Sequence, residues 1–314
     1  MQYRRLGNAG IKVSAVALGG WTTFGDSIRD ADLTREIILA AYDQGINFFD
    51  IADAYARGES ERMMGAVLKD LPRHTLVISS KLFWPMSDDV NDRGLSRKHI
   101  MESIEKSLKR IGTDYLDIYF CHRFDPETPL EEVVRAMDDL VHQGKVLYWG
   151  TSEWTGAQIA EAAGLARQFN LYAPRADQPG YNLLRRRRVE EDVIPAARAH
   201  GIGLTTFSPL GSGILTGKYD DGIPQESRAA RNEGMRERLT DDVVESVRRL
   251  KPIADDLGIT RAQLAMAWIL RHPEVSSVIT GATRPEHVVA NAGAAEVQLS
   301  DDVIAQLDEL FPVA

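Results

Sequence analysis

The sequence has very little cysteine and no long hydrophobic run. Its one cysteine, Cys121, cannot form a disulfide within the chain, which fits a reducing compartment, and we expect it to be a small buried hydrophobic residue. The longest apolar windows, such as 13–21, are far shorter than the roughly 20 residues of a membrane-spanning helix, and no charged-then-apolar leader precedes them. We therefore expect a soluble, cytoplasmic protein that does not enter a membrane.

The sequence also lacks an excess of basic charge. Its 37 basic and 46 acidic residues give a net charge of −9, which argues against the phosphate neutralisation that nucleic-acid binding requires. The run Arg185 to Arg188 is the exception, but Glu190, Glu191 and Asp192 follow it and offset most of its charge. We interpret the run as a solvated or subunit-contact surface.

Signatures of metal and nucleophile chemistry are missing as well. The seven histidines are scattered, and none lies in an HExxH or a Cys-x-x-Cys context, so we expect no catalytic metal. No serine has the context of a nucleophile elbow. Covalent catalysis is therefore not favoured.

What the sequence does have is a regular alternation of short apolar runs and longer amphipathic segments. The runs predict strands at 15–18, 46–50, 75–81, 116–121, 146–152, 175–179, 203–208 and 276–281. The amphipathic segments predict helices at 30–43, 60–69, 96–110, 129–143, 155–169, 189–200, 241–271 with a break near Gly258, and 285–293.

Eight strand-helix units predict a closed parallel barrel, the (β/α)8 TIM barrel, as a single domain over 1–314. We expect three appendages: an N-terminal β-hairpin turning across Asn8 to Gly10, the loop 209–240, and extra C-terminal helices ending with 300–310. The rival is an open doubly wound sheet. Its dinucleotide fingerprint is absent, since the nearest candidate, 211–217, has one residue too many before its last glycine and lies late in the chain.

Four polar residues fall at or just after strand ends: Asp50, Tyr55, Lys81 and His122. In a parallel barrel the carboxyl ends of the strands line one mouth, so these side chains should converge there, provided that the loop to Tyr55 curls back. Taken singly, each has an ordinary structural explanation, such as a helix cap or a surface charge. Their joint placement favours a catalytic site.

This set of residues suits proton donation to a carbonyl oxygen. A phenol has a pKa near 10, and a neighbouring ammonium such as Lys81 would lower it, with Asp50 holding the ammonium in place. His122 could donate a hydrogen bond to the carbonyl oxygen or share the proton of Tyr55. Reduction of a carbonyl needs a hydride as well as a proton, and these side chains supply only the proton. A nicotinamide cofactor is the usual hydride donor.

Several motifs resemble the aldo-keto reductase family. They are FDIADAY, GESE, SSK, CHR, WGTSEW, FSPLGSGILTGKY and SVITGATRPEHVVAN. The branch with the greatest resemblance includes the voltage-gated potassium channel β subunits and bacterial glyceraldehyde 3-phosphate reductases. The resemblance implies a barrel that binds NADPH and reduces aldehydes or ketones, with Asp50, Tyr55, Lys81 and His122 as the catalytic tetrad and Tyr55 as the general acid.

The resemblance also implies a set of NADP-binding residues. They are Gly20, Trp21, Asp50, Ser152, Gln178, Phe207, Ser208, Leu210, Gly211, Lys218, Arg228, Gly281, Thr283, Arg284, His287 and Asn291. Cations in this set would offset the charge of a 2′-phosphate, which favours NADP over NAD.

Two alternatives remain open: a dedicated sugar-phosphate reductase, and a redox-sensing regulatory subunit of a membrane transport protein. The channel subunits carry Asn where this chain has His122, which favours an active reductase. Aromatic residues after strand ends predict the lining of the substrate pocket; they are Trp21, Tyr55, Phe83, Trp84 and Trp154. The branch often forms tetramers, so a homo-oligomer is possible.

Overall fold

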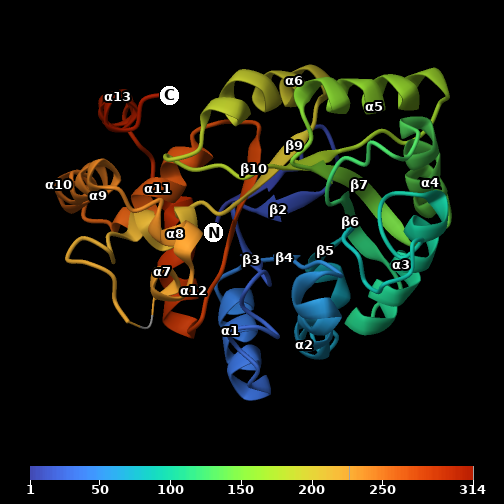
Figure 1. The fold of residues 1–314 in the computed structure, drawn as a ribbon, viewed down its shortest axis with the longest axis horizontal. Coiled ribbons are helices and arrows are strands. Elements are labelled where there is room, and N and C mark those ends of the chain that lie inside the picture. Colours follow the sequence, from blue (N-terminus) through green and yellow to red (C-terminus); the bar gives the residue numbers. More distant parts are fainter. Residues whose placement is uncertain (226, 314) are drawn as a thin grey trace.

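The computed structural model describes residues 1–313 apart from residue 226. Eight parallel strands form a closed barrel in the order β10-β3-β4-β5-β6-β7-β8-β9. Figure 1 shows the helices arranged around these strands. The predicted (β/α)8 barrel is therefore confirmed.

All eight predicted strands are present in the barrel, with ends that differ from prediction by two residues at most. They are β3 (Val16–Gly19), β4 (Phe48–Asp50), β5 (Val77–Leu82), β6 (Leu116–Cys121), β7 (Val146–Ser152), β8 (Ala176–Gln178), β9 (Gly203–Phe207) and β10 (Val275–Thr280). Most of these segments are buried along their whole length, as expected for parallel strands covered by helices.

The barrel helices also match their predicted positions. They are α1 (Ala31–Asp43), α2 (Glu59–Leu68), α3 (Arg97–Ile111), α4 (Leu130–His142), α5 (Gly156–Gln168), α6 (Ile194–His200), α11 (Arg261–Leu270) and α12 (Pro285–Ala292). Local signals set their ends. Ser96 accepts a hydrogen bond from the His99 backbone at the start of α3, and Gly112 ends that helix in a left-handed conformation.

The remaining helices lie outside the regular repeat. They are α7 (Arg228–Arg231), α8 (Glu233–Arg236), α9 (Asp241–Arg248), α10 (Leu250–Asp256) and α13 (Asp301–Leu310). The predicted helix 241–271 is thus three helices, with a break at Arg249 in addition to the one near Gly258. The predicted helix 189–200 begins with a π-helical segment, Val189–Val193, before α6.

The predicted N-terminal hairpin is formed by β1 (Tyr3–Arg5) and β2 (Lys12–Ser14), which pair antiparallel. It lies at the amino ends of the barrel strands, where the Arg4 guanidinium donates to the carbonyl oxygen of Val275 and Ser276 donates to that of Arg5. Side chains of the hairpin and of the barrel interior form one hydrophobic cluster. The hairpin contributes Leu6 and Val13, and the barrel strands contribute Phe48, Val77, Ile118, Phe120 and Ile279. This end of the barrel is therefore filled, and the carboxyl ends of the strands are left for a site.

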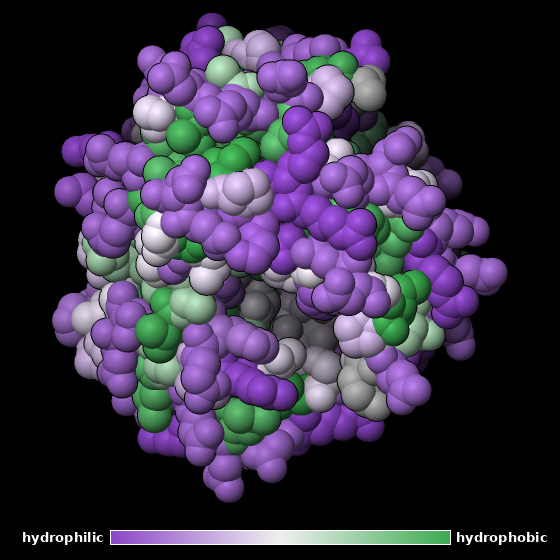
Figure 2. Space-filling model, turned by 90° about the vertical axis from the view of Figure 1, so that its left-hand side faces the viewer, coloured by the Kyte–Doolittle hydropathy of each residue, from purple (hydrophilic) through white to green (hydrophobic). Residues whose placement is uncertain are grey.

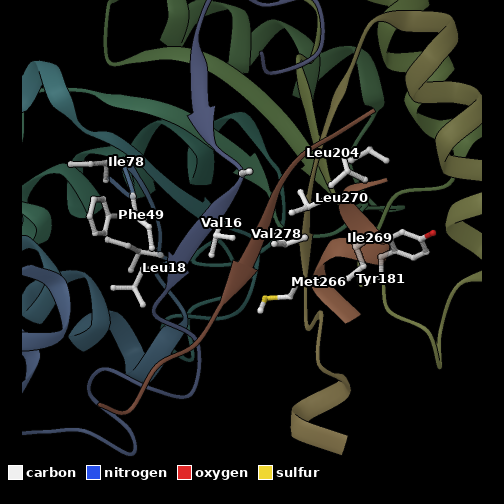
Figure 3. Close-up of a cluster of buried hydrophobic side chains, with 14 of the residues drawn as sticks. Val16, Leu18, Phe49, Ile78, Tyr181, Leu204, Met266, Ile269, Leu270 and Val278 are labelled. Carbon is white, nitrogen blue, oxygen red and sulfur yellow. The ribbon is translucent and has the colours of Figure 1, made fainter. Parts of the chain in front are cut away.

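A larger hydrophobic core lies between the strands and the helices. Figure 3 shows part of it, where Val278 of β10 and Leu204 of β9 lie near Met266, Ile269 and Leu270 of α11. Burial of such side chains stabilises the fold by about 1.5–3 kcal/mol each. The result is a rigid frame for the loops that follow the strands.

The face of the molecule on the α7–α11 side is mostly hydrophilic. Figure 2 shows hydrophilic side chains around a hollow near the middle of this face, with smaller hydrophobic patches between them. Among the described residues, no helix is both long and apolar enough to span a membrane.

Candidate active site

A buried ion pair joins the ends of β4 and β5. These two strands are neighbours in the barrel, and Asp50 pairs with Ser79 in their register. The Lys81 Nζ donates to Asp50 Oδ2 at 2.6 Å and to the Ile51 carbonyl oxygen at 2.7 Å. The side chains of Lys81 and Asp50 are 0% and 3% exposed, so water does not screen this pair.

The Asp50 carboxylate has further donors. Its Oδ1 accepts from Ser79 Oγ at 2.7 Å and from Gln178 Nε2 at 2.9 Å. Burial lowers the pKa of Lys81, but Asp50 and Tyr55 together more than offset this effect, so the pKa lies above its ordinary value. Lys81 is therefore a permanent ammonium.

Tyr55 lies in the loop after β4 and curls back to this ammonium. The Lys81 Nζ is 4.7 Å from the centre of the Tyr55 ring. The next three residues, Ala56, Arg57 and Gly58, all have positive φ angles of 48°, 54° and 83°. Two of them are not glycine and are therefore strained, a feature that clusters at functional sites.

The pKa of Tyr55 corrects one sequence-based expectation. Burial raises this pKa, and the charge and hydrogen bond of Lys81 only partly offset the rise, so the pKa of Tyr55 is above its ordinary value. Lys81 acts in the predicted direction, but it does not outweigh burial in the unliganded site. Tyr55 is therefore a phenol that holds its proton at neutral pH.

His122 follows β6 and packs edge-to-face on Tyr55, with 5.7 Å between ring centres. Burial, together with Lys81 and Arg123, holds the pKa of His122 well below its ordinary value, so the ring is neutral. Its Nδ1 is buried and has no hydrogen-bond partner among the residues that the structure describes. This arrangement favours the tautomer with the proton on Nε2, since a buried N–H without an acceptor is costly.

A cavity of about 970 Å³ opens beside these groups, near the upper end of the range for ligand sites. The predicted site residues that line it are Trp21, Asp50, Tyr55, His122, Ser152, Gln178, Phe207, Ser208, Leu210, Lys218, Gly281, Thr283 and His287. The predicted residues that do not are Gly20, Lys81, Gly211, Arg284 and Asn291. Arg228 begins α7, and its side chain lies outside the described part of the chain.

The loop after β9 forms a backbone concavity in the cavity wall. Ser208, Gly211, Ser212 and Gly213 have positive φ angles of 54°, 55°, 61° and 89°. Leu210 has φ −100° and ψ 12° directly before Gly211, and the N–H groups of Gly211 and Gly213 donate to the Ser208 and Leu210 carbonyl oxygens within the loop. A Cβ on Gly213 would lie 2.7 Å from Lys218 Nζ, so a larger residue there would displace this cation.

Two further pairs of residues line the cavity. The Ser152 hydroxyl donates to the Gln178 carbonyl oxygen at 2.9 Å, while the Gln178 side chain is engaged by Asp50. The rings of Trp21 and Phe207 are edge-to-face, with 6.0 Å between their centres. Of the predicted aromatic lining, Trp21, Tyr55 and Trp84 line the cavity, whereas Trp154 is fully buried and Phe83 packs against Trp84.

Sequence reasoning missed several lining residues, among them Thr22, Arg123, Ser212, Gly213 and Arg231. Arg123 directly follows His122, so its place after a strand end was an available signal. Arg231 lies in the 209–240 segment, where nothing in the sequence distinguishes it from its neighbouring arginines. No group of three potential metal-ligating side chains occurs within the described residues.

Comparisons with known proteins agree with this fold. The model of the aldo/keto reductase family matches residues 15–311. An Arabidopsis thaliana protein named as a probable voltage-gated potassium channel subunit beta is 49% identical over 304 residues, covering 95% of this chain and 92% of that protein. An Oryza sativa protein with the same name is 46% identical over 317 residues, covering 98% and 96%.

A more distant organism provides a similar match. A Schizosaccharomyces pombe protein named as a putative voltage-gated potassium channel subunit beta is 44% identical over 325 residues, covering 98% of this chain and 93% of that protein. The family match spans nearly the whole barrel, including every strand end that contributes to the cavity. The chain belongs to the aldo/keto reductase family.

Proposed function

We propose that the protein reduces aldehydes or ketones to alcohols with NADPH, and that Tyr55 is the general acid. The observation that carries the proposal is the buried Lys81 ammonium, which is fixed by Asp50 and lies against the Tyr55 ring. The carbonyl carbon gains a hydride from bound NADPH and its oxygen gains the Tyr55 proton, which gives the alcohol and NADP⁺.

The chain's own residues account for the proton step. As negative charge develops on the carbonyl oxygen, Tyr55 donates its proton, and Lys81 stabilises the phenolate that remains. His122 is neutral, and its Nε2 proton would hold the carbonyl oxygen beside Tyr55. The raised pKa of Tyr55 keeps the proton in place until that charge appears.

The volume and the lining of the cavity support a dinucleotide cofactor that carries an additional phosphate. The loop after β9 places Ser208, Ser212 and Gly213 in the cavity lining, where the serine hydroxyl groups could donate to a pyrophosphate. Lys218 and Arg231 line the same cavity and would offset the charge of a 2′-phosphate, which supports NADP over NAD. Ser152 and Gln178 lie near Asp50, where they could hold a carboxamide.

The test is steady-state oxidation of NADPH and of NADH with a panel of aldehydes and ketones. We expect carbonyl-dependent oxidation, with a higher kcat/KM for NADPH than for NADH. Lack of oxidation with every carbonyl would contradict the proposed reaction, and equal use of both cofactors would contradict the role of Lys218 and Arg231.

A second candidate is a redox-sensing subunit of a membrane transport protein. The names of the relatives favour it, since all three are named as probable or putative voltage-gated potassium channel β subunits. His122 favours the enzyme, because a neutral histidine beside Tyr55 can hold a carbonyl oxygen for protonation. Affinity purification from the membranes of the source organism separates the two; a stoichiometric transport protein would support the second candidate, and self-association alone would count against it.

A further inference from the structure

The Tyr55 end of the cavity carries one cation that the proposed chemistry does not use. Lys81 is neutralised by Asp50, and both are buried. Tyr55 and His122 are both neutral at neutral pH, since burial is the largest influence on each pKa. Arg123 is then the remaining charged side chain that follows β6 and lines this end.

The Arg123 guanidinium is held in place but not neutralised. It donates to the carbonyl oxygen of His122, and its central carbon lies 5.4 Å from the centre of the Trp84 ring. Within the described residues it has no carboxylate partner at ion-pair distance. A guanidinium has five N–H donors, so several remain for a ligand.

Glu153 is the nearby carboxylate that could have paired with Arg123, but it is already occupied. Its two oxygens accept from Arg185 at 2.6 Å, from Arg188 at 2.9 Å and from the Gly180 backbone at 2.6 Å. Two guanidinium groups are therefore paired with this carboxylate, and Glu153 acts on Arg123 only through its charge at longer range. The local charge is positive although the whole chain has a net charge of −9.

Asp26 is the other carboxylate to consider. It is an exposed residue of the loop after β3 and also lines the cavity. Arg123 is nevertheless among the main charges that act on the Tyr55 phenol, and Asp26 is not. The substrate end of the cavity is therefore electropositive.

We propose that Arg123 binds an anionic group of the substrate, so that the preferred substrates are short carbonyl compounds that carry a carboxylate or a phosphate. This inference rests on the proposed function, and it names the substrate class of the same site. With the carbonyl oxygen between Tyr55 and His122, the anionic group lies toward Trp84, whose ring centre is 6.2 Å from that of His122. A planar guanidinium can bind either anion in a bidentate manner.

The experiment compares two matched pairs of substrates with NADPH. One pair is 4-oxobutanoate and butanal, and the other is glyceraldehyde 3-phosphate and glyceraldehyde. We expect a higher kcat/KM for the anionic member of at least one pair, and the two pairs distinguish carboxylate from phosphate. In Arg123→Gln the ratio of anionic to neutral kcat/KM should fall roughly 10- to 100-fold, as for loss of a charge-assisted hydrogen bond. Arg123→Lys keeps the positive charge and should retain part of the preference for anionic substrates.

The control is Arg187→Gln, which removes the same charge from an exposed pair with Glu191 outside the cavity lining. Its ratio should change by less than about fivefold. A rival role for Arg123 is to lower the pKa values of Tyr55 and His122 through its charge. Loss of that role would lower kcat for neutral and anionic substrates alike. An unchanged ratio in Arg123→Gln therefore overturns the inference, while turnover of neutral carbonyls leaves the proposed function intact. Absence of turnover with all four compounds overturns both.

Discussion

Replacing Lys81 by methionine should destabilise the protein because it leaves the Asp50 carboxylate buried without its cation. At an N–O distance of 2.6 Å and an effective dielectric constant of about 20, the attraction within the pair is about 6 kcal/mol, part of which offsets the cost of burying both charges. Loss of one partner of a buried pair typically costs about 3–5 kcal/mol. We expect that range for Lys81→Met.

The double variant Asp50→Asn/Lys81→Met should regain much of this loss. A neutral asparagine oxygen can still accept from Ser79 and Gln178, and no charge remains buried. We expect the double variant to be at least about 2 kcal/mol more stable than Lys81→Met alone.

The assay is urea unfolding of wild type, both single variants and the double variant at pH 7, with unfolding free energies taken from midpoints and slopes. Lys98→Met is the matched control, since its exposed pair with Glu102 should contribute less than about 1 kcal/mol. A Lys81→Met protein as stable as the control, or a coupling energy below about 0.5 kcal/mol, would refute the description of Asp50 and Lys81 as a tightly coupled pair.

Three further predictions concern pH, cofactor choice and helix packing. Burial raises the pKa of Asp177 to about 7, so the folded protein loses stability as pH rises from about 4 through about 7. The unfolding free energy of Asp177→Asn, measured in urea, should therefore rise relative to that of wild type by up to about 4 kcal/mol between pH 4 and pH 8. A difference between the two proteins that is independent of pH would contradict this. Lys218→Ala should raise the KM for NADPH, measured from initial rates, by roughly 10-fold or more and leave the KM for NADH nearly constant. An equal change in the two KM values would place Lys218 away from the 2′-phosphate. Gly65→Ala should destabilise the protein by about 1–3 kcal/mol despite the better helix propensity of alanine, because its Cβ would lie 2.3 Å from the Ile111 carbonyl oxygen. A higher melting temperature of the variant in thermal unfolding would show that α2 and α3 can separate at no cost.

The barrel could be predicted because each strand and helix has its own local pattern. Buried strands such as Leu116–Cys121 are mostly apolar, and helix ends carry caps such as Ser96. The break at Arg249 does have a signal, because Pro252 follows it and has no N–H to donate to the Arg248 carbonyl oxygen; the prediction of one helix overlooked this proline. The π-helical segment Val189–Val193 could not be predicted from the periodicity of the apolar residues.

The candidate site was predictable in part, for a related reason. The barrel rule places Asp50, Tyr55, Lys81 and His122 at one mouth, and the structure brings them together. The net pKa shift of Tyr55 was not predictable, because it depends on how far burial outweighs a neighbouring charge.

The role that we infer for Arg123 was hidden for a similar reason. It depends on Glu153 being occupied by Arg185 and Arg188, and such long-range pairings leave no pattern in a single sequence.

Single-turnover oxidation of bound NADPH by a reactive aldehyde, compared between wild type and Tyr55→Phe, tests the central claim most directly. Removal of the phenol hydroxyl takes away the proton donor while the ring keeps its packing against His122. We predict a rate roughly 10²- to 10⁴-fold lower, with a Kd for NADPH that is nearly constant, since the hydroxyl acts mainly in the transition state. Equal rates in the two proteins would contradict Tyr55 as the acid.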